Sequence, residues 1–217
     1  MLPLVDGILQ SGMESHGTPP LDPIEGRVLG VLVEKQMTTP DNYPLTLAGV
    51  VAGCNQSTNR EPVMSLDQAE VEQALVRLHD AGLATPVRRQ GDRTTKYRHK
   101  AGEALEIDES AQAVLAVLLL RGPQTGGELR GRTDRYVAFA STQEVESVID
   151  RLEESGLALR LPRIPGQSQR RVRQLLAAST ETESTATDTG APGLEERVRA
   201  LEERFEELLD RLGVEDL

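Results

Sequence analysis

The chain of 217 residues is long enough for one large domain or two small ones, and because aromatic side chains make up only 2% of it, we expect a core of Leu, Val, Ile and Ala on helices. The formal net charge is −11, but most of the acidity lies beyond residue 178, so the sum does not exclude a nucleic-acid partner for the rest of the chain. A single cysteine excludes an internal disulfide, and with only three histidines it argues against a structural zinc site, so no metal or cofactor is expected.

Residues 1–20 are expected to form a disordered N-terminal extension. Their apolar run is interrupted by Pro3 and Asp6 and follows no basic residue, which does not fit a signal peptide. No stretch of eighteen apolar residues is present to cross a bilayer. We therefore expect a cytoplasmic protein without a membrane partner.

Three helices are predicted in the first part of the chain. Val28, Val31 and Leu32 mark the buried face of the first, and a shorter second helix covers roughly residues 45–53. The third helix carries apolar residues at the i, i+3, i+4, i+7 spacing of an amphipathic helix, and Gly82 ends it. The period then becomes that of extended chain, which predicts a β-hairpin that turns at Gly91.

The same order returns further along the chain. The apolar positions of the third helix and the residues that end it recur 74 positions downstream without a gap, as Val145, Val148, Ile149, Leu152, Gly156 and Leu157. The first helix recurs at a spacing of 86, and a second hairpin is predicted to turn at residues 165–166. Three helices followed by a hairpin is the winged-helix order. The predicted fold class is mainly α with small β-hairpins, as two tandem winged-helix domains at residues 21–102 and 103–177.

The end of the chain changes character twice. Residues 178–193 are rich in Ser, Thr, Glu, Pro and Gly without apolar periodicity, which predicts a flexible linker. Residues 194–213 then follow a heptad spacing, which predicts a C-terminal helix. This helix forms either a short coiled coil, which favours a homodimer, or an amphipathic helix against the body. The residues expected to contact a partner are Leu194, Val198, Leu201, Phe205 and Leu208.

Several long strings carry a family resemblance. They are "LDPIEGRVLGVLVEKQMTTPDNYPLTLAGVVAGCNQSTNREPVM" from residue 21, "GDRTTKYRH" from residue 91 and "LLLRGPQTGGELRGR" from residue 118. Over residues 21–176 the chain closely resembles the YceH family of bacterial proteins. The resemblance implies tandem winged-helix domains, and it supplies no function, catalytic residue or ligand.

The polar stretch "CNQSTNREPVM" at residues 54–64 contains the only cysteine. Cys54 falls at the C-terminal end of the predicted second helix, where the helix dipole disfavours a thiolate, so we expect a structural cysteine and no enzyme activity. The polar side chains that follow are expected to bond to the backbone and set the angle between the second and third helices. An alternative is that Asn59 and Arg60 contact a partner.

The third helix needs an N-cap after this loop. Ser65 and Asp67 are the two candidates, because either side chain can accept a hydrogen bond from the first turn. Gln68 lies three residues after Ser65 and would complete a capping box with it.

Both predicted hairpins are strongly basic in an acidic chain. Strand residues two apart project to the same side of a hairpin, so these cations are placed to follow a phosphate backbone. The candidate nucleic-acid contacts are Arg88, Arg89, Arg93, Lys96, Arg98, Arg160, Arg163, Arg170, Arg171 and Arg173.

The two third helices carry the opposite charge. Carboxylates outnumber cations on each of them, and side chains that read base edges are scarce. We therefore predict a non-enzymatic, transcription-associated protein that grips DNA phosphates through its hairpins with weak sequence specificity. The alternative is a scaffold that binds a protein through its paired winged helices and its C-terminal helix.

Overall fold

The computed structural model describes residues 21–178, apart from residues 89, 90, 92, 164, 165, 167 and 168. The predicted N-terminal extension, linker and C-terminal helix, including its expected partner contacts, lie outside the described residues. Within the described ranges no helix is both long and apolar enough to cross a membrane.

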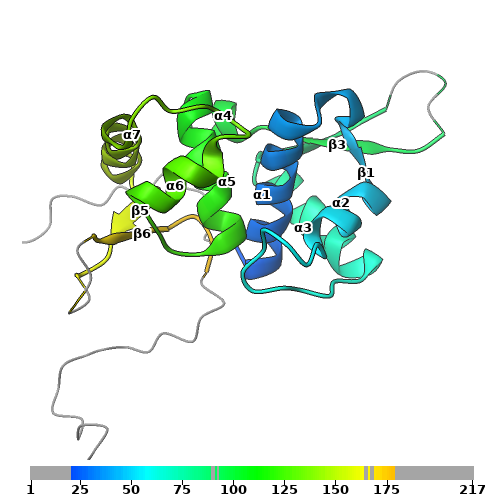
Figure 1. Ribbon diagram of the computed structural model, residues 1–217. Helices are drawn as coiled ribbons and strands as arrows, with labels where there is room; N and C mark the ends of the chain where they lie inside the picture. Colours follow the sequence, from blue (N-terminus) through cyan, green and yellow to red (C-terminus); the bar gives the residue numbers. More distant parts are fainter. Residues whose placement is uncertain (1–20, 89–90, 92, 164–165, 167–168, 179–217) are drawn as a thin grey trace, which may run out of the picture. The chain divides into compact units, whose positions relative to one another are not determined.

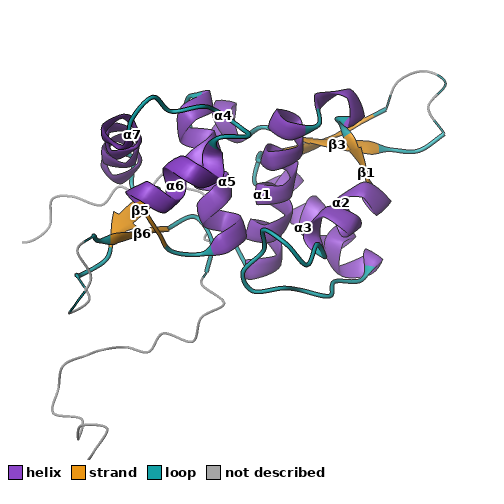
Figure 2. Cartoon of the chain, in the orientation of Figure 1, coloured by secondary structure: helices purple, strands orange, loops and turns teal. Residues whose placement is uncertain are grey.

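The described residues are mainly helical with two small antiparallel sheets, which confirms the predicted class at that level (Figure 2). The first half contains α1 Pro23–Thr38, the 3-10 helix η1 Pro40–Asn42, β1 Leu45–Thr46, α2 Leu47–Cys54, α3 Gln68–Asp80, β2 Ala84–Val87 and β3 Lys96–His99. The second half contains α4 Ala101–Ala104, α5 Glu109–Arg121, β4 Gln124–Thr125, α6 Gly126–Thr133, α7 Thr142–Glu154, β5 Ala158–Arg160 and β6 Arg171–Gln174. Apart from η1 and α4, the two halves have the same order of elements.

Each sheet has one strand more than the predicted hairpin. The two-residue strands β1 and β4 precede the second helix of each half and pair with the last strand, which gives the orders β1-β3-β2 and β4-β6-β5. In the first sheet Leu45 lies opposite Tyr97, and Val87 lies opposite Lys96. Two residues are too few to show the alternation of a strand, so the sequence analysis assigned the residues of β1 to the second helix. That helix begins at Leu47 and not at residue 45.

Side-chain caps fix where the helices begin. Asp67, and not Ser65, caps α3, and its capping-box partner is Glu70 instead of Gln68, so the Ser65 alternative was wrong. Asp67 accepts from the Glu70 amide at 2.9 Å, while the Glu70 carboxylate accepts from the Asp67 amide at 2.7 Å. The carboxylates satisfy amides that have no partner within the helix, and they lie at the positive end of its dipole.

The first helices of the two halves, α1 and α5, pack against each other at the centre of the described unit (Figure 1). Two glycines of α1 allow the close approach. A Cβ atom on Gly26 would lie 2.7 Å from the Cβ of Ala177, and one on Gly30 would lie 3.0 Å from the Leu120 side chain. Leu21 adds two backbone hydrogen bonds to the end of the second half, at 2.9 Å to Leu176 and 2.8 Å from Ala178.

The two halves therefore share one hydrophobic core. Nearly all buried apolar residues of both halves belong to a single contiguous cluster, and the described residues form one compact unit. Within this unit the hairpins β2–β3 and β5–β6 lie on opposite sides of the α1–α5 pair (Figure 1).

Candidate nucleic-acid interface

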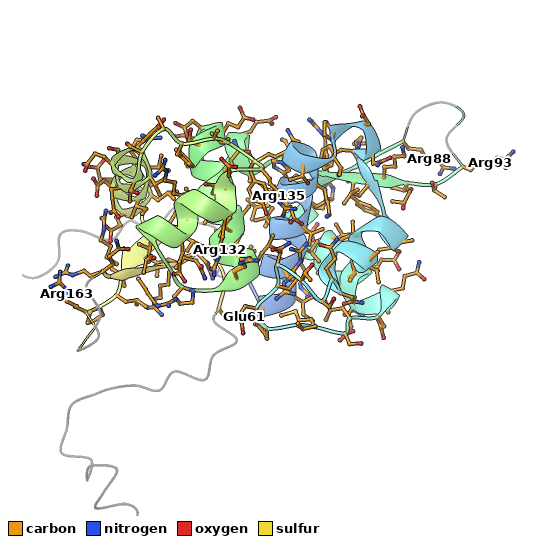
Figure 3. The ribbon with its side chains drawn as sticks, viewed as in Figure 1. Glu61, Arg88, Arg93, Arg132, Arg135 and Arg163 are labelled. Carbon is orange, nitrogen blue, oxygen red and sulfur yellow. The ribbon has the colours of Figure 1, made fainter. Side chains whose placement is uncertain are left out.

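The first hairpin displays its cations to solvent. Arg88 follows β2 and Arg93 precedes β3, and both extend beyond the sheet at the hairpin tip (Figure 3). Lys96 and Arg98 lie two residues apart on β3 and therefore share one face of the strand. Arg88, Arg93 and Arg98 are exposed, and Lys96 is half-buried.

No ion pair among the described residues neutralises the charges of this hairpin. Among the described residues, the side chains of Arg88, Arg93, Lys96 and Arg98 form no ion pair with a carboxylate. Arg89, the fifth predicted contact here, lies outside the described residues. The end of β3 is anchored to the first half, because the Tyr43 hydroxyl accepts a hydrogen bond of 2.7 Å from the His99 backbone amide. Figure 1 shows this hairpin extending away from the helices.

The second hairpin differs, because Arg160 is held inside a cluster of carboxylates on α7. Its Nη2 lies 2.8 Å from Glu146 Oε2 and 2.7 Å from Asp150 Oδ1, and its Nη1 binds Glu153. Partial burial lowers the pKa of the Arg160 guanidinium, but the hydrogen bonds to Glu146, Asp150 and Glu153 outweigh burial and raise it. Arg160 as a phosphate contact therefore stays a prediction, and the structure pairs its guanidinium with carboxylates of the same chain.

The remaining arginines of the second hairpin fall into two groups. Arg171 Nη1 donates to the Pro123 carbonyl at 2.8 Å and lies 3.5 Å from Glu128, and Arg173 is half-buried. Arg163 and Arg170 are exposed, and Arg163 lies at the far end of the hairpin (Figure 3). The second hairpin therefore presents fewer uncompensated cations than the sequence suggests.

The third helices expose an acidic surface. On α3 the exposed side chains include Glu72, Val76 and Asp80, and Val76 retains 56% of its surface. On α7 they include Glu144 and Glu154. The arginine that each helix exposes is paired with a carboxylate of the same half, Arg77 with Asp22 and Arg151 with Asp108, so neither guanidinium is free to read a base edge in a major groove.

The polar stretch at residues 54–64 joins the two halves. The Glu61 amide donates to the Leu120 carbonyl at 2.8 Å, and the Arg121 guanidinium donates to Asn59 Oδ1. Asn59 adopts a φ of 61°, in the left-handed region that Asn tolerates better than most residues. The loop therefore sets the position of α5 as well as the angle between α2 and α3.

Arg60, predicted as an alternative partner contact, is buried. Its Nη2 lies 2.5 Å from Glu34 Oε2 and its Nε donates to the Gly53 carbonyl at 3.0 Å. From the second half, the Tyr136 hydroxyl donates to Glu34 Oε1 at 3.1 Å. Burial raises the pKa of Glu34, but the hydrogen bond and charge of Arg60, with smaller effects of Lys35 and Tyr136, lower it overall. Arg60 and Glu34 thus form an internal ion pair of the first half, which Tyr136 connects to the second half, and the buried Arg60 side chain has no surface to offer a partner.

A signal for this pair was present in the sequence. Glu34 interrupts the apolar run of the first helix, which is buried on every side from Glu25 to Glu34. A carboxylate in such a helix needs a cation or several hydrogen bonds. Nothing in the local pattern identified Arg60 or Tyr136 as the partners, because they lie 26 and 102 residues away in sequence.

Cys54 is fully buried at the end of α2, as expected of a structural cysteine. Burial raises the pKa of its thiol to about 12 against the opposing charges of Arg27 and Arg60. A neutral thiol is a poor nucleophile and a poor metal ligand. Within the described part of the chain, no three His, Cys, Asp or Glu side chains are grouped to hold a metal ion.

Comparisons with known proteins agree on one family. The family model described as "Protein of unknown function, DUF480" matches residues 21–167. A UPF0502 protein of Dechloromonas aromatica (strain RCB) is 41% identical over 204 residues, which cover 89% of this chain and 95% of that protein. The UPF0502 protein Smlt0097 of Stenotrophomonas maltophilia (strain K279a) is 39% identical over 215 residues, covering 94% and 98%. A UPF0502 protein of Solibacter usitatus (strain Ellin6076) is 43% identical over 192 residues, covering 87% and 92%.

Proposed function

We propose a function from the premise that this chain belongs to the DUF480 family of uncharacterised bacterial proteins, also called UPF0502 or YceH. The proposed function is that the protein binds the phosphate backbone of DNA through its first hairpin. The observation that carries the proposal is the set of cations on that hairpin. Arg88, Arg93, Lys96 and Arg98 have no carboxylate partner among the described residues, in a chain whose net charge is −11.

The proposal includes a winged-helix assignment for each half. The order of helix, strand, helix, helix, strand, strand supports it, as do the sheet orders β1-β3-β2 and β4-β6-β5. In this assignment β2–β3 and β5–β6 are the wings. Residues 21–102 and 103–177 are then two modules fused into one rigid unit by the packing of α1 on α5.

Phosphate binding by a wing accounts for the charge distribution. Arginine and lysine on one face of a strand reach successive phosphates and release their counterions, which gives affinity without sequence information. The acidic surfaces of α3 and α7 would be repelled by the same backbone, so neither helix enters the major groove in this proposal. Sequence preference is therefore weak and arises from DNA shape.

A second candidate function, a protein-binding scaffold, rests on a different surface. Val63 and Val76 retain 60% and 56% of their surface, and Val76 lies beside Glu72 and Asp80 on the exposed side of α3. Val76 therefore gives the acidic side of α3 an apolar point that a protein partner could cover. A basic partner would be the complement of this surface.

Duplex binding by matched variants separates the two candidates. The double variant Arg88→Ala/Arg93→Ala removes two wing cations, and Arg130→Ala/Arg151→Ala removes two exposed cations from α6 and α7 and serves as the control. Near 0.1 M salt, each lost phosphate contact weakens binding severalfold, so the wing variant should bind a random duplex about 10- to 100-fold more weakly. Equal affinities of the two variants would contradict the wing proposal, and failure of the unmodified protein to bind at low salt would favour the scaffold.

A further inference from the structure

A cavity of about 260 Å³ lies where the two halves meet, and three arginines line it. Arg121 comes from the end of α5, Arg132 from α6 and Arg135 from the turn after α6. The first half contributes Asn59, and Tyr136, Val117 and Leu120 complete most of the wall. Figure 3 shows Arg132 and Arg135 where α5 and α6 approach α1.

The cavity is electropositive because its cations exceed its anions. Asp134 is the one carboxylate that lines it beside the three guanidiniums, among the described residues. Arg60, directly behind Asn59, is already neutralised by Glu34. Burial lowers the pKa of Arg121, and the neighbouring charges of Arg132, Arg135 and Arg60 lower it further against the opposing effect of Tyr136. Like charges held this close in a recess are relieved by a bound anion.

Most of the donors in the cavity remain available. Arg121 uses its Nη2 to hold Asn59 Oδ1, which leaves its other nitrogens. Arg132 Nη2 lies 3.6 Å from Glu128, a loose surface pair within one helix. Arg135 is exposed and forms no ion pair within the described ranges. Planar guanidiniums bind phosphate oxygens in pairs, so three of them can surround one phosphoryl group.

We propose that this cavity binds the phosphoryl group of a small molecule, with Arg121, Arg132 and Arg135 as its ligands. The recess argues for a small molecule, because it is larger than a phosphate ion and the Tyr136 side chain lines it beside the arginines. Since Asn59 belongs to one half and the arginines to the other, the ligand would bind across their joint. The site does not depend on the DNA-binding proposal, because none of its residues lies on a hairpin.

Thermal unfolding of the full chain with inorganic phosphate tests the site. Phosphate is titrated against chloride at constant ionic strength, with Arg132→Gln/Arg135→Gln as the site variant and Arg130→Gln/Arg163→Gln as a control of equal charge. We expect phosphate at about ten times its Kd to raise the Tm of the unmodified protein and the control by a few °C. The site variant should show no such rise. Absence of a phosphate-specific rise in the unmodified protein, or an equal rise in the site variant, would overturn the proposal.

A single variant keeps the test decisive if the double variant does not fold. Arg135→Gln changes an exposed side chain and should weaken phosphate binding about tenfold by calorimetry, since it removes one charge-assisted contact. An unchanged Kd would count against the assignment. Duplex binding by the site variant then identifies the source of the phosphate. Unchanged duplex affinity supports a small molecule, whereas a loss as large as that of the wing variant would assign the cavity to a DNA phosphate and overturn the small-molecule proposal.

Discussion

At the scale of single residues, Glu34 and Arg60 form a buried ion pair in the first half, and the Tyr136 hydroxyl connects this pair to the second half. The Arg60 side chain is fully buried, and it binds Glu34, the Gly53 carbonyl and Gln56. Replacing it would remove the closer cation and hydrogen-bond donor of the buried Glu34 carboxylate and leave only the more distant Lys35, 3.5 Å away, which costs far more than the loss of a surface pair.

Arg60→Ala is therefore expected to lower the free energy of unfolding by about 3–5 kcal/mol. Urea denaturation followed by circular dichroism measures the change. Arg151→Ala is the matched control, because its exposed pair with Asp108 should contribute less than about 1 kcal/mol. A loss below about 1 kcal/mol for Arg60→Ala would show that water or a rearranged partner satisfies Glu34.

His99 gives the protein a pH dependence. Burial, with a smaller contribution from Arg98, lowers the pKa of His99 to about 4 against the opposing charge of Glu103. The unfolded chain takes up this proton near pH 6.5 and the folded chain does not, so stability is complete above that pH and falls as the pH drops toward 4. Its Nδ1 accepts from the Ala101 amide at 3.3 Å, which agrees with a neutral ring.

The free energy of unfolding should accordingly fall by about 2 kcal/mol between pH 7.5 and pH 5. His99→Asn keeps an acceptor for the Ala101 amide and removes the titrating group, so most of this slope should disappear. Urea denaturation of both proteins at several pH values gives the difference between their free energies of unfolding. The pH dependence due to carboxylates is common to both proteins and cancels in this difference. Parallel pH profiles for the two proteins would show that the folded protein binds this proton as readily as the unfolded chain.

At the scale of elements, the packing of α1 on α5 depends on the absence of a side chain at Gly26. A Cβ at this position would lie 2.7 Å from the Cβ of Ala177, which the backbone holds in place. In an ordinary helix, alanine is more stable than glycine by about 1 kcal/mol. At Gly26 this gain in helix propensity is opposed by the cost of an overpacked contact between the two halves.

Gly26→Ala is expected to destabilise the protein by about 1–3 kcal/mol despite its better helix propensity. Gly131 offers a direct comparison, because it also lies within a helix and a Cβ there would meet no atom within 4 Å. Gly131→Ala should stabilise by up to about 1 kcal/mol. Stabilisation by both substitutions, measured by chemical denaturation, would mean that α1 and α5 are packed less closely than described.

The long elements were predictable from the sequence, and the contacts between them were not. The apolar period located α3 and α7 and their terminating glycines, because each helix buries one face in the shared core. The strands β1 and β4 were missed, since a strand of two residues has no period. The role of residues 54–64 was only half predicted: their backbone hydrogen bonding follows from residue type, but the bonds to Leu120 and Arg121 depend on how distant segments meet.

The candidate interface shows the same division between local and distant information. The sequence places several arginines on each hairpin, and from it the two hairpins were expected to present similar positive charge. The carboxylates that neutralise Arg160 come from α7, between 7 and 14 residues earlier in the chain. A helix and a strand that follow each other can form such a cluster, but only the three-dimensional packing shows that they do.

At the scale of the whole molecule, the described residues form one unit with an uneven charge distribution. The shared core holds both halves rigidly, so the first hairpin has a fixed base from which its cations extend. The acidic third helices discourage a nucleic acid from binding elsewhere on the same unit. Binding of the DNA backbone through the first hairpin explains both the exposed cations of that hairpin and the acidic surfaces of the third helices.

The salt dependence of duplex binding tests this account most directly. Fluorescence anisotropy with a random duplex, repeated across a series of salt concentrations, gives the slope of log affinity against log salt. Four phosphate contacts predict a slope of about −4 for the unmodified protein and about −2 for Arg88→Ala/Arg93→Ala, because each contact contributes about −0.9. A slope that stays the same in the variant, or one near zero in the unmodified protein, would contradict the account.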